Sequence, residues 1–441
     1  MTLVYCKYMK WLCLLVGFAL VQSCSSEGFL DGVGESPAPE RVVKPVERRT
    51  FLVYSAGFNS LSKALSDDID DIVSGYLPWN GSGSDVVLVY SKSTENNVSD
   101  YAVATPSYMV RLSSDMYGNP VRDTLMTWPS TFVASSASTV RIVLDYVRQN
   151  YPSSSYGMLF TSHASGWLPS GYYTTNKITS SSQPSSLHET PVSLTPVSYA
   201  DLPQEPGFPA VKSIGVDNID AHSAYEMEIE DFARAIPFHL DYMIFDACLM
   251  GGVETAYALK DRCSKIIFSP TEVLSDGLVV YTELISRLLG STAPDLAGVC
   301  DDAYAYYSSK EDMEQSLTIS MVDCTHIDEV ATAVKDLSEK YSGLLASVKP
   351  SSVQRYYRFG KHWFYDLEDI FVKSGVIEAD LAPLRDAMSS CVVYKAATKR
   401  FLSIDITDYS GLSMYLPCDG NADLDGFYKT LSWNEASSLV R

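Results

Sequence analysis

The chain has 441 residues, of which 46% are hydrophobic, which is typical of a globular protein with a sizeable core. Its formal net charge of −21 at pH 7 argues against nucleic acid as a partner, because a negatively charged protein repels a polyanion. Cationic substrates would instead be attracted.

The N-terminus has the features of an export signal. Residues 9–24, MKWLCLLVGFALVQSC, combine a basic start, an apolar stretch and a small residue before a cysteine. The stretch is too short for a membrane-spanning helix, so it predicts a signal peptide over residues 1–23. VQSC resembles the lipobox of bacterial lipoproteins, which implies that Cys24 is acylated and becomes the mature N-terminus. Ordinary signal removal is the alternative.

Composition divides the rest of the chain into three parts. Residues 24–48 are rich in Ser, Gly and Pro without periodicity, which predicts a flexible tether. A folded core is expected over residues 49–309. A C-terminal α/β extension, packed on that core, is expected over residues 310–441.

Short apolar runs alternate with helical patterns along the core. The runs are typical of parallel strands covered on both faces, and they occupy residues 49–56, 84–92, 156–162, 241–247 and 264–270. Helical periodicity is found over residues 136–151, 227–236 and 251–262. This alternation predicts βαβ units and an open, mostly parallel sheet.

Three residues with reactive or charged side chains follow predicted strands. Asp246, Cys248 and His163 all lie at carboxyl ends, where sites form in such sheets. We expect a cysteine between a strand and a helix to be held as thiolate by backbone N–H groups and the helix dipole. His163 offers the proton donor and acceptor that a cysteine nucleophile needs, and small residues follow it whose N–H groups suit an oxyanion. Each residue alone is more often structural.

The remaining cysteines do not suggest disulfides or metal. Removing the leader and a lipidated Cys24 leaves six, widely spaced and without a CxxC pair. If one of them is a nucleophile, the odd number that remains cannot all pair. A disulfide framework is therefore not expected.

Two acidic stretches have carboxylates that could bind calcium. The run DDIDD at residues 67–71 is interpreted as a solvated helix face. NADLDG at residues 421–426 matches half of a calcium loop, but Ser432 stands where the closing glutamate belongs, which favours a polar turn. No cofactor is expected to be required for the chemistry, and calcium stays open without an assigned site.

Two motifs resemble those of the clostripain-like cysteine peptidases, relatives of the caspases and gingipains. FDACLMGGVETAY at residues 245–257 is similar to the nucleophile motif, and HASGW at residues 163–167 is similar to the histidine motif. Weaker similarities lie at residues 52–72, 269–277 and 410–417. The resemblance runs from about residue 49 to the C-terminus and implies a caspase-like three-layer α/β sandwich.

The resemblance also implies roles for single residues. Cys248 would attack the scissile carbonyl, and His163 would protonate the leaving amine. The backbone N–H groups of Cys248 and Ala164 would form the oxyanion hole, with alanine where caspase relatives usually have glycine. Asp246 would be the floor of a pocket that takes Arg and, less readily, Lys. A helix N-cap is the alternative for Asp246.

The segment between the histidine and the cysteine predicts a loop insertion at about residues 169–213, rich in Ser, Thr, Pro and Tyr. Clostripain-like enzymes are often cut in this region after a basic residue. Lys177 and Lys212 are the only Lys or Arg residues there, and Lys177 is the predicted site. An uncut surface loop is the alternative.

Together these observations predict an exported endopeptidase, lipid-anchored to a bacterial membrane on the periplasmic side or at the cell surface. It is expected to be a monomer that acts on proteins or peptides containing Arg or Lys. The alternative is a catalytically silent lipoprotein that binds ligands at the surface with the same fold.

Overall fold

A computed structural model of the chain describes residues 47–81, 83–97, 103–172, 192–193, 214–220, 223–358 and 363–441. The predicted signal peptide, Cys24, most of the tether and Lys177 lie outside these residues. Within the described ranges, no helix has both the length and the apolar character needed to cross a membrane.

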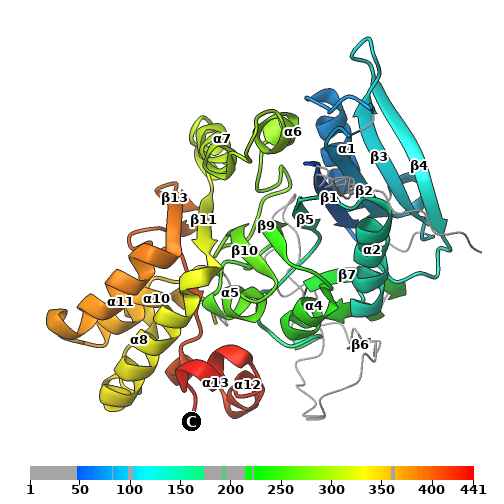
Figure 1. Cartoon of the computed structure of the whole chain (residues 1–441). Coiled ribbons are helices and arrows are strands. Elements are labelled where there is room, and N and C mark those ends of the chain that lie inside the picture. The colour runs from blue at the N-terminus through cyan, green and yellow to red at the C-terminus, as the bar shows by residue number, and fades with distance from the viewer. Residues whose placement is uncertain are drawn as a thin grey trace, which may run out of the picture. The chain divides into compact units, whose positions relative to one another are not determined.

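A nine-stranded sheet forms the centre of the folded part (Figure 1). Its order is β13-β11-β10-β9-β5-β1-β2-β3-β4, and β3 and β11 run opposite to the other seven strands. The strands are β1 (Arg49–Ala56), β2 (Val86–Lys92), β3 (Ser107–Ser114), β4 (Pro120–Trp128), β5 (Ser155–Thr161), β9 (Leu240–Asp246), β10 (Cys263–Phe268), β11 (Thr318–Asp323) and β13 (Val392–Ala397).

Three small sheets accompany the central one. They are formed by β6 (Val192–Ser193) with β8 (Ser223–Met227) and β7 (Ile214–Asp220), by β12 (Tyr365–Asp366) with β16 (Ser413–Met414), and by β14 (Arg400–Phe401) with β15 (Ile404–Asp405).

Helices cover both faces of the sheet, as Figure 1 shows. One face carries α1 (Ser62–Ser74), α6 (Tyr281–Leu289) and α7 (Leu296–Ser308), which contact one another in that order. The other carries α2 (Ala137–Asn150), α4 (Ile229–Ala235) and α5 (Val253–Leu259). The remaining helices are α8 (Ile327–Lys340), α9 (Ser342–Leu345), α10 (Leu367–Lys373), α11 (Glu378–Cys391), α12 (Ala422–Tyr428) and α13 (Ser432–Ser437).

The predicted α/β fold with a mostly parallel sheet is confirmed. Each of the five predicted strands is present within two residues of its expected ends, and the three predicted helices correspond to α2, α4 and α5. The Ser136 hydroxyl caps α2 by accepting from the Thr139 N–H, which explains where that helix begins. The β3–β4 hairpin was not among the predicted elements.

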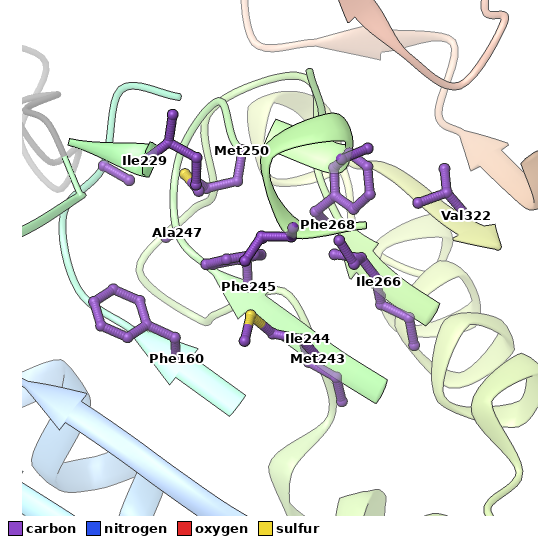
Figure 2. Close-up of a cluster of buried hydrophobic side chains, with 14 of the residues drawn as sticks. Phe160, Ile229, Met243, Ile244, Phe245, Ala247, Met250, Ile266, Phe268 and Val322 are labelled. Carbon is purple, nitrogen blue, oxygen red and sulfur yellow. The ribbon is translucent and has the colours of Figure 1, made fainter. Parts of the chain in front are cut away.

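The core lies on both faces of the parallel strands. Figure 2 shows Phe160 of β5 beside Ile244 and Phe245 of β9, with Ile266 and Phe268 of β10 next to them. All five side chains are fully buried. Because helices cover both faces, these strands have continuous apolar sequences rather than alternating ones.

The C-terminal part completes the sheet and supports the histidine loop. Strands β11 and β13 extend the sheet beyond β10. The ring of Trp167, four residues after His163, lies 4.9 Å from the rings of both Tyr415 and Tyr428. Glu254 of α5 accepts hydrogen bonds from the Tyr415 N–H at 2.9 Å and the Tyr428 hydroxyl at 2.7 Å.

The parallel pairing of β5 with β9 brings the two predicted motifs together. Thr161 pairs with Asp246 at the carboxyl ends of these strands, so the chain continues into two adjacent loops. The loops touch at Gly166, which has φ +59°, and a Cβ there would lie 2.5 Å from the backbone oxygen of Leu249. Only glycine fits this contact without displacing backbone.

We expect Gly166→Ala to destabilise the protein by about 2–5 kcal/mol, because the left-handed backbone and the backbone clash both oppose a methyl group. Gly118→Ala is the matched control, since Gly118 has φ +84° but open space around its Cβ position. That variant should lose only about 1–2 kcal/mol. Chemical denaturation measures both losses, and equal losses would show that the loop contact contributes nothing.

Candidate active site

A small cavity opens at the carboxyl ends of β5 and β9. Cys248 and Asp246 line it together with Asp68 of α1. Residues 273–275 and Gly277, from the loop after β10, close another side. A candidate nucleophile therefore shares one cavity with two carboxyl groups that come from different elements.

Cys248 is buried, with 3% of its surface exposed. Its Sγ accepts a hydrogen bond from the Val273 N–H at 3.3 Å and donates to the Val273 oxygen at 3.8 Å. Burial, and then the nearby Glu272 carboxylate, raise the pKa of the Cys248 thiol to about 12. Glu272 itself is held by Arg358, at 3.0 Å between Oε2 and Nε. The thiol is therefore protonated at neutral pH in this state.

The expectation of a thiolate at Cys248 is wrong for the arrangement described. Helix α5 begins at Val253, five residues beyond the cysteine, and Gly252 is its N-cap. A helix dipole acts only within its first turn, so it does not offset the burial of the sulfur. The close backbone approach expected at the glycines is present, since a Cβ on Gly251 would lie 2.4 Å from the Pro270 nitrogen.

Leu249 directly follows the cysteine with φ +60°, in the left-handed region that a branched residue seldom occupies. Its N–H donates to the Thr271 oxygen at 2.8 Å. The loop after β10 thus holds a strained backbone next to Cys248. Such strain persists only where surrounding contacts fix it, and it is common at functional sites.

His163 lies just past β5, two residues beyond Thr161, which pairs with Asp246 of β9. It is 1% exposed, and its Nε2 lies 2.8 Å from the Ser60 hydroxyl at the start of α1. The His163 oxygen accepts from the Gly215 N–H at 3.0 Å. Ser60 was not among the predicted site residues, since nothing in its local sequence separates it from an ordinary helix start.

A buried ion pair fixes the segment that supports the histidine loop. Lys92 Nζ lies 2.6 Å from the Asp217 carboxylate, and both side chains are buried. The Val216 N–H donates to the Ser162 hydroxyl at 3.2 Å, and its oxygen accepts from the Asn59 amide at 2.8 Å. Residues 214–217 are therefore bound to the loop that carries His163.

Ala164 is compatible with its position. It is fully buried, and among the described residues 162–172 the left-handed conformations are confined to Gly166 and Gly171. The alanine in place of glycine therefore imposes no left-handed strain on the loop.

Asp246 lies at the base of the cavity and caps no helix. Its Oδ1 accepts from the Leu278 N–H at 2.7 Å. Its Oδ2 accepts from the Thr161 hydroxyl at 2.9 Å and from the Tyr281 hydroxyl at 2.5 Å. Burial raises the pKa of Asp246, and these three donors oppose that rise.

The interpretation of DDIDD as a solvated face is wrong for Asp68, which is 7% exposed. The buried side of α1 consists of Ser62, Leu65, Asp68 and Ile72. The spacing of Leu65, Asp68 and Ile72 by three and four residues is the signal that could have identified this burial. Burial, and then the Asp246 charge, raise the pKa of Asp68 to about 9.

The NADLDG segment begins a helix. Asn421 caps α12 by accepting from the Asp423 and Leu424 N–H groups. Within the described part of the chain, no cluster of three His, Cys, Asp or Glu side chains could hold a metal ion. The six cysteines that follow Cys24 are all free, in agreement with the expectation that they form no disulfide framework.

Comparison with known proteins identifies the family of the chain. Residues 202–438, more than half of the chain, match the Clostripain family of peptidases, Peptidase C11. No curated protein matches the chain.

Solved structures share the fold. The chain is 25% identical to an inactive zymogen C11 protease from Parabacteroides distasonis, with a TM-score of 0.68 over 88% of this chain and 97% of that one. It is 22% identical to a secreted C11 cysteine protease from Bacteroides thetaiotaomicron solved with an irreversible peptide inhibitor, with a TM-score of 0.68 over 88% and 98%. The family match and the shared fold together mean that the chain belongs to the clostripain family, C11, of cysteine peptidases.

Proposed function

We propose that the chain is an endopeptidase that cleaves after Arg, and less readily Lys, through Cys248 and His163. The observation that carries this proposal is the register of β5 and β9, because His163 and Cys248 each lie two positions beyond the paired residues Thr161 and Asp246. The loops that carry them meet where Gly166 approaches the Leu249 backbone. The family match supports the same chemistry.

The reaction divides into two steps. His163 takes the proton of the Cys248 thiol, the resulting thiolate attacks the scissile carbonyl carbon, and the backbone N–H groups of Cys248 and Ala164 stabilise the oxyanion. The carbonyl then re-forms as the C–N bond breaks, and His163 gives its proton to the leaving amine. Water, deprotonated by His163, hydrolyses the thioester and releases the acid and the free thiol.

The charge of the cavity supports selection for basic side chains. Asp246 lies two residues before the nucleophile and lines the same cavity as its sulfur. A neutral substrate side chain would leave a buried carboxyl group without a counter-charge, which is costly, whereas a cation would compensate it. Arginine matches a carboxylate through its planar fork.

A catalytically silent binding protein on the same fold is the second candidate. The abundance of tyrosine, 29 residues, gave it some support because aromatic surfaces bind glycans. The combination of Cys248, His163 and an acidic cavity favours the peptidase instead.

Fluorogenic peptides that differ only in the residue before the scissile bond test this function. We expect turnover after Arg, weaker turnover after Lys, and at least about 100-fold lower kcat/KM after Ala or Asp. Cys248→Ala should abolish turnover, while Cys418→Ala, which removes an exposed free cysteine, should leave it unchanged. Absence of turnover on every peptide would favour the binding protein, and preference for Asp would contradict the basic pocket.

We further propose that the intact chain is an inactive precursor, activated by its own cleavage after Lys177. The similar protein from Parabacteroides distasonis is an inactive zymogen. The buried Cys248 thiol with its raised pKa supports an inactive state here, because thiolate is the nucleophilic form. Residues 214–217 give a physical link, since they connect the segment downstream of Lys177 to the His163 loop.

On incubation, the wild-type chain should therefore be cut after Lys177, as seen by gel and mass spectrometry. Lys177→Ala and Cys248→Ala should stay intact, and Lys212→Ala should be cut normally. Iodoacetamide should label Cys248 slowly in the intact form, with a rate that rises about tenfold per pH unit near neutrality, and faster once the chain is cut. A wild-type chain that stays intact, as Cys248→Ala does, would remove the proposal.

Lipid attachment at Cys24 would place the enzyme at a membrane surface. The motif VQSC after an apolar stretch supports this proposal. Bacteria expressing the chain should incorporate labelled palmitate into it, and Cys24→Ala should abolish the label. Secretion of unlabelled wild-type protein into the medium would instead indicate ordinary signal removal.

A further inference from the structure

The cavity beside Cys248 contains a carboxyl group that the basic-pocket proposal does not use. Asp68 projects from α1, on a different element from Asp246, and lines the same cavity. Two buried carboxyl groups next to one nucleophile raise the question of which one meets the substrate's charge.

Asp246 has little acceptor capacity left. A carboxylate has about four lone-pair sites. Three of them are taken by the Leu278 N–H and by the hydroxyls of Thr161 and Tyr281. Because an arginine fork needs two acceptor sites, Asp246 alone cannot receive it without losing a bond that it already makes.

Asp68 has the opposite character. Only 7% of the surface of Asp68 is exposed. Within the described ranges, however, no hydrogen bond or ion pair reaches its carboxyl group. Burying a carboxyl group without partners is costly, and such groups are otherwise paired. An unpartnered carboxyl group that faces a cavity is therefore suited to a ligand that brings hydrogen-bond donors and positive charge.

We propose that Asp68 binds the charged end of the substrate side chain before the scissile bond, with the remaining acceptor site of Asp246 as its neighbour. This inference rests on the proposed peptidase function and assigns the main charge recognition within it. Asp246 then acts chiefly as a fixed base of the cavity, held by β5 and α6 through Thr161 and Tyr281.

Charge and protonation follow from the surroundings of Asp68. The titratable groups that act on it or respond to its charge are Asp67 and Asp71 on its own helix, Asp246, Asp276, Tyr281 and Tyr307. With the cavity empty, burial favours the neutral carboxyl group. A guanidinium or ammonium group that enters makes the carboxylate favourable, so binding releases one proton to solvent.

The decisive experiment compares peptides with arginine or citrulline before the scissile bond, because citrulline has nearly the shape of arginine without its charge. For wild type, kcat/KM should be much higher with arginine. Asp68→Asn should reduce that arginine-to-citrulline ratio by about 10- to 100-fold, as expected for losing a charged hydrogen-bonded pair. Turnover of the citrulline peptide should be retained or increased.

Asp71→Asn is the matched control, since it removes the same charge from an exposed position on the same helix. Its ratio should stay within about twofold of wild type, because exposed charges are screened by solvent. If Asp68→Asn keeps the wild-type ratio, Asp68 does not bind the charge, although the peptidase function stands. Equal losses on both peptides would mean a structural role and would also overturn the inference. Wild type without activity on arginine would overturn the proposed function and this inference with it.

Two further measurements separate recognition from misfolding. The folded state raises the pKa of Asp68 above its unfolded value, so the folded chain holds the extra proton and stability falls as pH rises between these values. Asparagine removes that loss, so Asp68→Asn should melt at or above the wild-type temperature at pH 8. The arginine-to-citrulline ratio of wild type should rise from pH 6 to pH 9, and Asp68→Asn should flatten it. A wild-type ratio independent of pH would contradict the inference.

Discussion

Parallel pairing between β5 and β9 puts Thr161 beside Asp246, and His163 and Cys248 each follow two positions further on. The hydrogen bonds between these strands thus bring together the two loops that carry the candidate catalytic residues. Residues 214–217, which belong to the segment between the histidine and the cysteine, add hydrogen bonds from the Gly215 and Val216 N–H groups to the histidine loop.

One property of the cavity governs both candidate functional groups. Exclusion of water raises the pKa of Cys248 and that of Asp68, each with burial as the first cause. The same low polarity that keeps the thiol protonated strengthens any interaction with an entering cation. The proposed inactivity of the intact chain and the proposed selection for a cation would therefore both follow from one environment.

The fold was predictable from the sequence because its strands are buried on both faces. The apolar runs that became β1, β5 and β9 could hardly form anything else between helical segments. The β3–β4 hairpin escaped prediction, since β4 is mostly exposed, only half of β3 is buried, and both strands mix polar with apolar residues. Its alternation is weaker evidence than a continuous apolar run.

Only those site residues that belong to a recognisable sequence motif could be predicted. Cys248, His163 and Asp246 could be selected because they follow strands and match family motifs. Protonation of the cysteine could not be predicted, since it depends on the burial of the sulfur, on the nearby Glu272 carboxylate and on the late start of α5. The burial of Asp68 was encoded in the helical stripe, but a run of four aspartates draws attention to charge rather than to spacing.

The topology also constrains what a cut chain would look like. Strands β1, β2 and β5 precede the segment at residues 173–213, whereas β9 and β10 follow it, yet all belong to one sheet. The ion pair of Lys92 with Asp217 spans the same divide. Two polypeptides produced by a single scission would therefore remain joined through the pairing of β5 with β9 as one particle, migrating together in size-exclusion chromatography and separating only in denaturant.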